Sequence, residues 1–231
     1  MTDQNISTLV TIAVVGGTGK EGSGLAMRLA SSGYRVIIGS RDGNRAQQKA
    51  EEFNTKMGSS YLRGMDNHSA VKEANLVIIS VPYESHEAIL TSVADVAQGK
   101  IVIDVTVPVK PSHPRVVNVP EGKAACLEAQ ALLGPDVKVV AAFQNVSYDH
   151  LQADTDTIDC DVLICGDDDH AKNEVIRLAH AIGMRGIDAG PLANAVAVEA
   201  LTPVLMYINR RYKVKGAGIV ITGLGDSPIA G

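Results

Sequence analysis

The chain has 231 residues, enough for one large α/β domain or for a domain with a small appendage. Hydrophobic residues make up 45% and aromatic residues only 3%, with no Trp, so the core must consist mainly of Val, Ile, Leu and Ala. The formal charge of −5 argues against a non-specific nucleic-acid binder, because binding the phosphate backbone requires a surplus of Lys and Arg.

Short apolar runs rich in Val and Ile recur along the chain, and continuous runs of this kind are typical of strands buried on both faces of a parallel sheet. We expect strands at 11–17, 35–40, 75–82, 100–108, 137–143, 161–168 and 184–190. Between them, helical patterns cover 21–33, 45–58, 85–99 and 169–183. Alternation of strand and helix predicts an α/β fold with a doubly wound, Rossmann-type parallel sheet.

The chain changes character after the predicted strand at 184–190. A long amphipathic segment at 193–213 contains Pro203, which we expect to kink or split it, and a strand-like run follows at 217–224. We therefore predict a dinucleotide-binding domain over 1–190 and a short, mainly helical segment over 191–231. That segment is too short for a core of its own, so we expect its apolar faces to be buried on the main domain or on a second subunit, and we predict a homodimer.

Cysteine usage and the lack of targeting signals bear on location. Cys126, Cys160 and Cys165 form neither an even-numbered disulfide framework nor a CxxC pair, so we expect reduced, packed thiols and no metal site. No uninterrupted apolar run reaches the ~18–20 residues of a membrane span, and the polar start MTDQNISTLV does not resemble a secretory signal. These features predict a cytoplasmic protein without a membrane segment.

The first strand leads into the glycine-rich stretch GGTGKEGSG, in which Gly17, Gly19 and Gly22 fit the pattern G-x-G-x-x-G. Glycine permits a tight turn and a close approach of the backbone to a pyrophosphate, and the N-terminus of the next helix favours an anion. Within a strand–turn–helix unit, the pattern predicts dinucleotide binding.

The second strand ends on Ser40 and Arg41, where an NAD-binding protein usually presents an acidic side chain to the ribose. A hydroxyl and a guanidinium suit a 2′-phosphate instead, and Arg45 lies one helical turn further on. We expect Asp42 to point to solvent. The sequence thus predicts NADP(H) as the cofactor.

The remaining strand ends are mostly apolar, and they include Val81, Pro82 and Val107. Among the histidines we expect His86 at the surface, His180 packed on its helix, and the others in solvent. The run Asp167–Asp169 precedes a helix, so we interpret it as a cap rather than as a metal site. We therefore predict no catalytic acid or base, which suits hydride exchange between two bound carriers.

Several stretches together resemble the NADPH:F420 oxidoreductase family, also called F420-dependent NADP reductases. The match runs over nearly the whole chain, and its most distinctive parts are CGDDD, DAGPL and EALTP. The resemblance implies hydride transfer between NADPH and the deazaflavin coenzyme F420. It also implies that the deazaflavin stacks on the nicotinamide in a substrate cleft that the C-terminal segment 191–231 closes.

The resemblance also assigns positions to the two ligands. It places the pyrophosphate on Thr18, Gly19, Lys20 and Glu21, the 2′-phosphate on Ser40, Arg41 and Arg45, and the nicotinamide side along Val81, Val107 and the segment after Phe143. Gln144 and Asn145 stand where the family pattern has a histidine and a threonine. The stretch from Gln144 to Tyr148 borders the expected deazaflavin.

Two other functions stay open at this point. One is an NADPH-dependent reductase of a small carbonyl or imine, although hydroxyacid members of that group carry a catalytic lysine and the segment 193–213 has none before Lys213. The other is a non-catalytic NADPH sensor that binds a partner protein.

Overall fold

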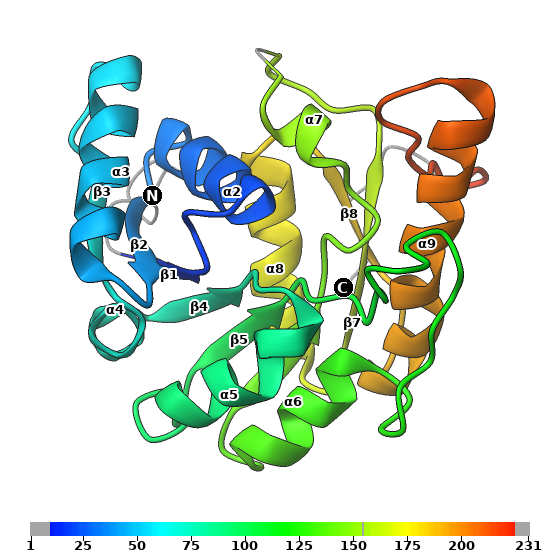
Figure 1. The fold of residues 1–231 in the computed structure, drawn as a ribbon, viewed down its shortest axis with the longest axis horizontal. Coiled ribbons are helices and arrows are strands. Elements are labelled where there is room, and N and C mark those ends of the chain that lie inside the picture. The colour runs from blue at the N-terminus through cyan, green and yellow to red at the C-terminus, as the bar shows by residue number, and fades with distance from the viewer. Residues whose placement is uncertain (1–9, 154, 225–231) are drawn as a thin grey trace.

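The computed structural model describes residues 10–153 and 155–224, which form one eight-stranded sheet flanked by helices (Figure 1). The strands are β1 (Thr11–Val15), β2 (Arg35–Ser40), β3 (Leu62–Asp66), β4 (Leu76–Ile79), β5 (Ile101–Asp104), β6 (Lys138–Ala141), β7 (Asp161–Gly166) and β8 (Arg185–Asp188). The helices are α2 (Lys20–Ser31), α3 (Gly43–Met57), α4 (Asn67–Glu73), α5 (Tyr83–Val93), α6 (Ala125–Leu133), α7 (Tyr148–Leu151), α8 (Asp169–Ala181), the 3-10 turn η1 (Leu192–Asn194) and α9 (Ala195–Tyr212).

The strand order is β3-β2-β1-β4-β5-β6-β7-β8, and neighbouring strands are parallel except for the antiparallel pair β6 and β7. The chain first builds outward from β1 to β3 and then returns to place β4 on the other side of β1. Ligands of doubly wound folds bind where the order reverses in this way, outside the carboxyl ends of the strands. The doubly wound prediction is confirmed, with one antiparallel step that it did not include.

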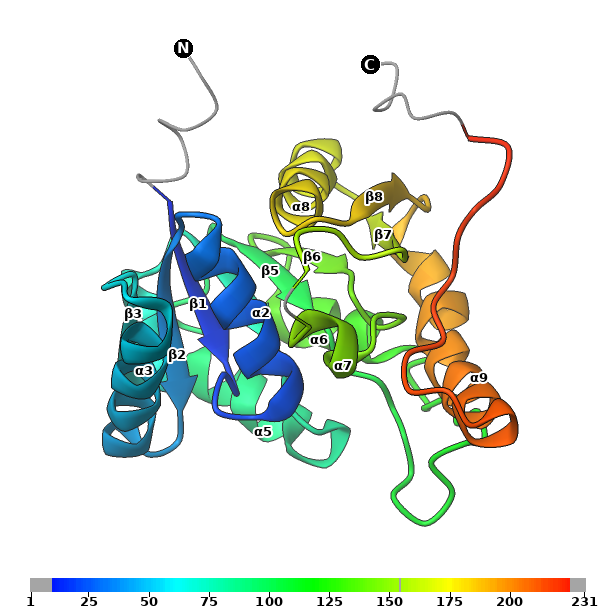
Figure 2. The same cartoon turned by 90° about the horizontal axis from the view of Figure 1, so that it is seen from above.

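Side chains of each central strand alternate between two apolar layers, as the period of a strand requires. Ile12 and Val14 join the layer beneath α2 and α8, whereas Val15 joins the layer beneath α5 and α6. Figure 2 shows helices on both sides of the sheet. Because both faces are covered, the strands read as continuous apolar runs in the sequence.

The expected reduced and packed state of the three cysteines is confirmed. Cys126, Cys160 and Cys165 are all free and buried.

The segment after β8 is only partly as expected. Of the two effects expected of Pro203, a kink or a split, the split does not occur, because α9 continues through this residue. No strand forms over 217–224; instead, Ile219 O accepts a hydrogen bond from Asp161 N, and Ile221 N donates to the Asp161 carboxylate. The stretch Leu192–Tyr212 is long and apolar enough, by length and composition, to cross a membrane, with a mean hydropathy of 1.3.

Four elements were not predicted: β3, α4, α6 and α7. Of β3 only Leu62 is buried, since β3 is the edge strand beside β2. An edge strand with one buried side chain has no apolar run for sequence patterns to detect.

Candidate functional site

The glycine-rich turn joins β1 to α2 at the point where the strand order reverses. Gly16 N and Gly17 N both donate to Gly39 O, so the turn is tied to the end of β2. A Cβ on Gly22 would lie 2.7 Å from Gly16 O, which explains why a side chain is excluded there. Among the described residues no side chain caps α2 at Gly19, so the helix N-terminus is left to bind an anion.

The end of β2 lies beside this turn and carries the predicted phosphate-binding residues. Ser40 Oγ accepts a hydrogen bond from Asp42 N at 3.2 Å. The Asp42 carboxylate does not simply point to solvent, because Oδ1 caps α3 by accepting from Asn44 N and Arg45 N. The acid is therefore occupied at the helix terminus, while Arg41 and Arg45 are exposed and form no ion pair within the described residues.

A cavity of about 330 Å³, here called the glycine-loop cavity, opens at the carboxyl ends of β4 and β5. Its walls combine the glycine turn with the apolar strand ends, as the sequence predicts. The predicted residues that line it are Gly19, Lys20, Glu21, Val81, Pro82, Val107 and Gln144.

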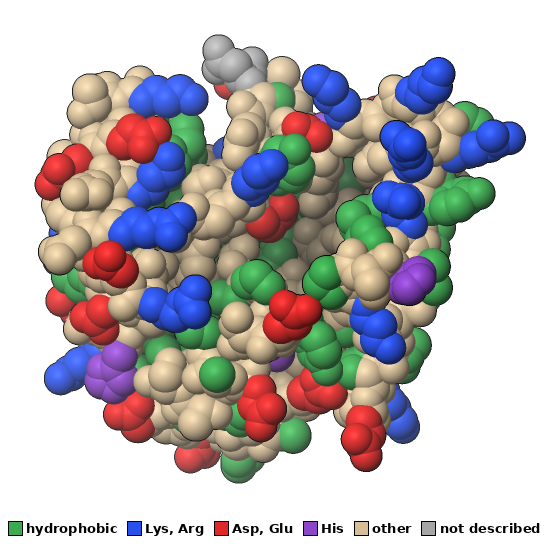
Figure 3. Space-filling model, viewed as in Figure 1, with side chains coloured by type: hydrophobic (Ala, Val, Ile, Leu, Met, Phe, Trp, Pro, Cys, Tyr) green, Lys and Arg blue, Asp and Glu red, His purple; other side chains and the backbone are tan. Residues whose placement is uncertain are grey.

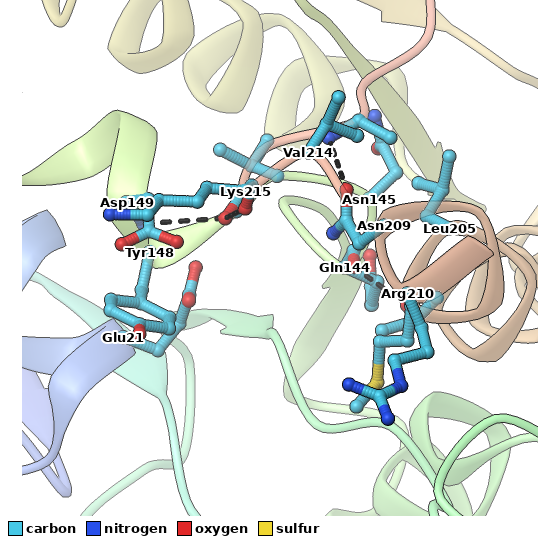
Figure 4. Close-up of a pocket in the computed structure, with 15 residues that line it drawn as sticks. Glu21, Gln144, Asn145, Tyr148, Asp149, Leu205, Asn209, Arg210, Val214 and Lys215 are labelled. Atoms are coloured by element: carbon cyan, nitrogen blue, oxygen red, sulfur yellow. Dashed lines mark hydrogen bonds between the residues drawn. The ribbon is translucent and has the colours of Figure 1, made fainter. Parts of the chain in front are cut away.

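A second cavity of about 500 Å³, here called the α9 cavity, lies between α7 and α9 (Figure 4). Glu21 and Tyr148 lie on one side of it, and Leu205 and Arg210 of α9 lie on the other. Lys20 Nζ lies 5.0 Å from the centre of the Tyr148 ring, within the range of a cation–π contact. The predicted residues Glu21, Gln144, Asn145 and Tyr148 line this cavity.

Four residues line both cavities, so the two spaces adjoin: Glu21, Gln144, Val146 and Thr202. The Oε1 atom of Glu21 is buried and has no hydrogen-bond partner among the described residues. Burial raises the pKa of the Glu21 carboxyl to about 8, so it is largely uncharged at neutral pH. In that state it carries no charge that would repel an anion at the neighbouring turn.

Gln144 is held at the junction of the two cavities by the turn at Phe143 and by hydrogen bonds of its own backbone and side chain. Phe143 has a left-handed φ of 71°, uncommon for an aromatic residue, and it turns the chain at this point. Gln144 Nε2 donates to Asp104 O at 2.7 Å, and Thr202 Oγ1 donates to Gln144 O at 2.6 Å. Gln144 Oε1 is buried without a partner among the described residues, so it is free to accept from a ligand.

Asn145 lines the α9 cavity, but its amide is used within the fold. Its Nδ2 donates to Asp161 O at 2.7 Å, and its Oδ1 accepts from Leu163 N at 3.5 Å. These bonds attach the segment after β6 to β7. Asn145 thus shapes the wall of the cavity rather than offering a free polar group.

Sequence reasoning missed a buried hydrogen-bonded pair, His86 of α5 and Asp104 of β5. His86 is not at the surface but 2% exposed, and its Nε2 lies 2.6 Å from Asp104 Oδ2. Burial opposes the charged imidazole, but the hydrogen bond to Asp104 and nearby carboxylates raise the net pKa of His86. Only the position of His86 just after a strand end could have indicated this contact.

Glu199 of α9 is a second buried titratable group that sequence reasoning missed. Its carboxylate accepts from Ala125 N and Cys126 N, which joins α9 to the start of α6. Burial raises the pKa of Glu199 to about 7, against the lowering effect of these two bonds. This contact fixes one end of the helix that forms the α9 cavity.

The other titratable residues have ordinary structural positions. Asp168 Oδ1 caps α8 through Ala171 N, which confirms the capping interpretation, and Asp167 accepts from Leu192 N. His180 is exposed rather than packed, and His150 is half-buried rather than in solvent, whereas His68, His113 and His170 are exposed as expected. Within residues 10–153 and 155–224, no group of three or more His, Cys, Asp or Glu side chains could hold a metal ion.

Comparison with known proteins places this site in a family. The family model described as NADP oxidoreductase coenzyme F420-dependent matches residues 11–108. The chain is 41% identical to the F420-dependent NADP reductase of Methanocaldococcus jannaschii, over 92% of this chain and 98% of that protein. It is 40% identical to the protein of the same name from Methanothermobacter marburgensis, over 93% and 99% of the two chains.

More distant proteins share part of the chain or the fold alone. Metalloreductase STEAP3 of Rattus norvegicus is 33% identical over 80% of this chain but only 35% of its own length. Among solved structures, a hypothetical protein from Sinorhizobium meliloti has a TM-score of 0.68 at 24% identity, covering 86% of this chain and 92% of that one. An imine reductase from Myxococcus stipitatus has a TM-score of 0.61 at 18% identity, covering 88% and 63%.

The matches to the two archaeal reductases each cover more than nine-tenths of this chain and nearly the whole of the relative. By this similarity, the chain belongs to the family of F420-dependent NADP reductases.

Proposed function

We propose that this protein transfers a hydride between NADPH and the deazaflavin coenzyme F420. The observation that carries the proposal is the junction of two cavities at one edge of the sheet, one reached from the glycine turn and the other bounded by α9. Two adjoining ligand spaces suit a reaction between two bound carriers, because alignment of the reacting rings supplies most of the rate.

The residues have distinct parts in this proposal. The turn at Gly17, Thr18 and Gly19, with the first residues of α2, binds the pyrophosphate through backbone N–H groups. Ser40, Arg41 and Arg45 bind the 2′-phosphate of NADPH and select it over NADH.

The reacting end of the site is mainly apolar. Val81, Pro82 and Val107 form the wall beside the nicotinamide, and Gln144 offers an unpartnered amide oxygen at the junction. Tyr148 and α9 border the deazaflavin. When bound, the deazaflavin ring is the group that accepts two electrons as a hydride. We propose no side chain as an obligatory acid or base.

The assembly belongs to the same proposal. Apolar side chains of α9 and of the segment before α6 are exposed: Val204 at 42%, Tyr207 at 57%, Val116 at 59% and Val119 at 56%. Burial of these side chains in an interface favours association, so we propose a homodimer. We also propose that the protein is soluble and cytoplasmic, as its sequence predicts. We also propose residues 1–190 as the cofactor-binding domain and 191–231 as the segment that closes the cleft and dimerises. Sedimentation at assay concentration measures the assembly, and a monomer would contradict the dimer.

The activity is tested by mixing protein, NADPH and F420 under anaerobic conditions and following the deazaflavin absorbance. We expect loss of the F420 band, with NADH much less effective than NADPH. Reduction of a cyclic imine or a small carbonyl, with no change in F420, would support the alternative suggested by the fold of the imine reductase. Tight NADPH binding with no turnover of either would support a sensor.

A further inference from the structure

Four cations lie close together where α9 ends, in a chain whose net charge is negative. This cationic segment consists of Arg210, Arg211, Lys213 and Lys215, all exposed. Arg210 and Lys215 line the α9 cavity. In Figure 3, Lys and Arg side chains gather over the end of α9, beside the hollow in this face.

The backbone holds the cationic segment in place at the mouth of the α9 cavity. Lys213 ends α9 in a left-handed conformation, with φ of 56°, and Val214 N donates to Asn209 O at 3.1 Å. Ala217 N donates to Asn209 Oδ1 at 2.7 Å, and Ser147 Oγ donates to Lys215 O at 3.3 Å. The segment therefore bridges from α9 to Ser147, the residue that caps α7, and the backbone that carries its charges is held in place.

The positive charge of the segment is not used within the described part of the protein. None of the four cations forms an ion pair there. Two acids line the α9 cavity, Asp149 and Glu21, and burial raises the pKa of Glu21 to about 8. The four cations outnumber the two acids, which leaves a surplus of positive charge at this mouth.

A structural role explains only part of the cluster. Arg210 and Arg211 lie in the last turn of α9, where cations favour the helix macrodipole. Lys213 and Lys215 lie at and beyond the helix end, where the dipole effect falls off within a turn. The charges of Lys213 and Lys215 therefore contribute a positive electrostatic potential at the mouth of the α9 cavity, which attracts an anionic ligand there.

The ligand of these cations is not the 2′-phosphate of NADPH. Ser40 ends β2, Arg41 follows it, and Arg45 lies in the first turn of α3. Figure 1 places α3 and α9 at opposite sides of the molecule. The cationic segment therefore lies at the α9 cavity, and none of its residues lines the glycine-loop cavity.

We propose that the cationic segment binds the anionic side chain of the deazaflavin coenzyme, and that it makes the protein prefer the complete coenzyme over its bare ring system. The proposal rests on the function proposed above. F420 carries its ring on a side chain with a phosphodiester and carboxylates, whereas FO, the deazariboflavin ring system, lacks them. Exposed ion pairs are individually weak and are screened by salt, so binding of F420 but not of FO depends on ionic strength.

The test measures binding without turnover, by fluorescence titration of F420 and of FO into protein saturated with NADP+. The variant is R211Q/K213Q, because neither side chain lines the α9 cavity and the ring site is left intact. Lys72→Gln removes an exposed lysine from the end of α4 and serves as the control. Circular dichroism of each variant checks the fold.

We expect R211Q/K213Q to weaken F420 binding about three- to tenfold, while FO binding changes less than about twofold and the control changes neither. In the unaltered protein, added salt weakens F420 binding and leaves FO binding nearly constant. Equal loss for F420 and FO, or no loss for either, overturns the cationic subsite alone. Failure of both ligands to bind overturns the proposed function together with it.

Discussion

Replacing Arg41 by Ala tests the basis of cofactor selection. Arg41 follows the last residue of β2, is exposed, and has no ion pair within the described residues, so its guanidinium is free to bind phosphate. A charge-assisted hydrogen bond contributes about 1.5–3 kcal/mol, and an exposed position favours the lower end of that range. About 1.5–2 kcal/mol corresponds to a ten- to thirtyfold weaker affinity for NADPH.

The assay is calorimetric titration of the Arg41→Ala protein with NADPH and with NADH. NADH lacks the 2′-phosphate, so its affinity should change less than about twofold. Arg35→Ala is the matched control, because Arg35 is also exposed and lies at the opposite end of β2. It should leave both affinities unchanged. An equal loss for NADPH and NADH in Arg41→Ala would refute the assignment of the phosphate site.

Three further predictions concern the turn and the buried acids. Gly22→Ala places a Cβ against the backbone oxygen of Gly16 and should weaken NADPH binding at least about tenfold in titration; unchanged affinity would contradict the role of the turn. Glu21→Gln should raise the free energy of unfolding by about 1–3 kcal/mol at pH 8 and by much less at pH 5. His86→Ala leaves the buried Asp104 unpaired and should lower the free energy of unfolding by about 3–5 kcal/mol in denaturant titration; a loss below about 1 kcal/mol would contradict the pairing.

The sign of the Glu21 effect follows from its raised pKa. In the unfolded chain the carboxyl has its ordinary pKa of 4.5, whereas in the folded protein its pKa is about 8. Between these values the folded state binds more protons, so the free energy of unfolding falls as pH rises, and Gln removes that fall. Urea titrations at both pH values measure it, and an equal gain at pH 5 and pH 8 would contradict the burial of the carboxyl.

Structure could be predicted from the sequence where a short local pattern is compatible with only one backbone arrangement. The glycine spacing after β1 depends on backbone geometry, and the pair Ser40 and Arg41 depends on where a single strand, β2, ends. Both were found at the edge of the sheet where the pattern predicts them. The central strands were predictable for the same reason, since burial on both faces leaves continuous apolar runs.

Contacts between residues far apart in the chain could not be predicted, because they leave no local pattern in the sequence. His86 and Asp104 are brought together by the packing of α5 against the sheet, and Glu199 reaches α6 across more than seventy residues of chain. The run 217–224 looks like a strand, but it makes irregular bonds to Asp161 instead of a ladder. Asn145 was expected beside a ligand, and its type alone does not indicate that its amide is used to hold β7.

Direct transfer between two stacked carriers is the central claim, and an isotope measurement tests it most directly. NADPH deuterated at C4 on either face is incubated with the protein and F420 in ordinary water, and the reduced deazaflavin is analysed by mass spectrometry. We predict that one of the two labelled forms delivers its deuterium to F420 without exchange, because the hydride passes between adjoining cavities. Reduced F420 that carries only hydrogen from the solvent, with both labelled forms, would contradict direct transfer.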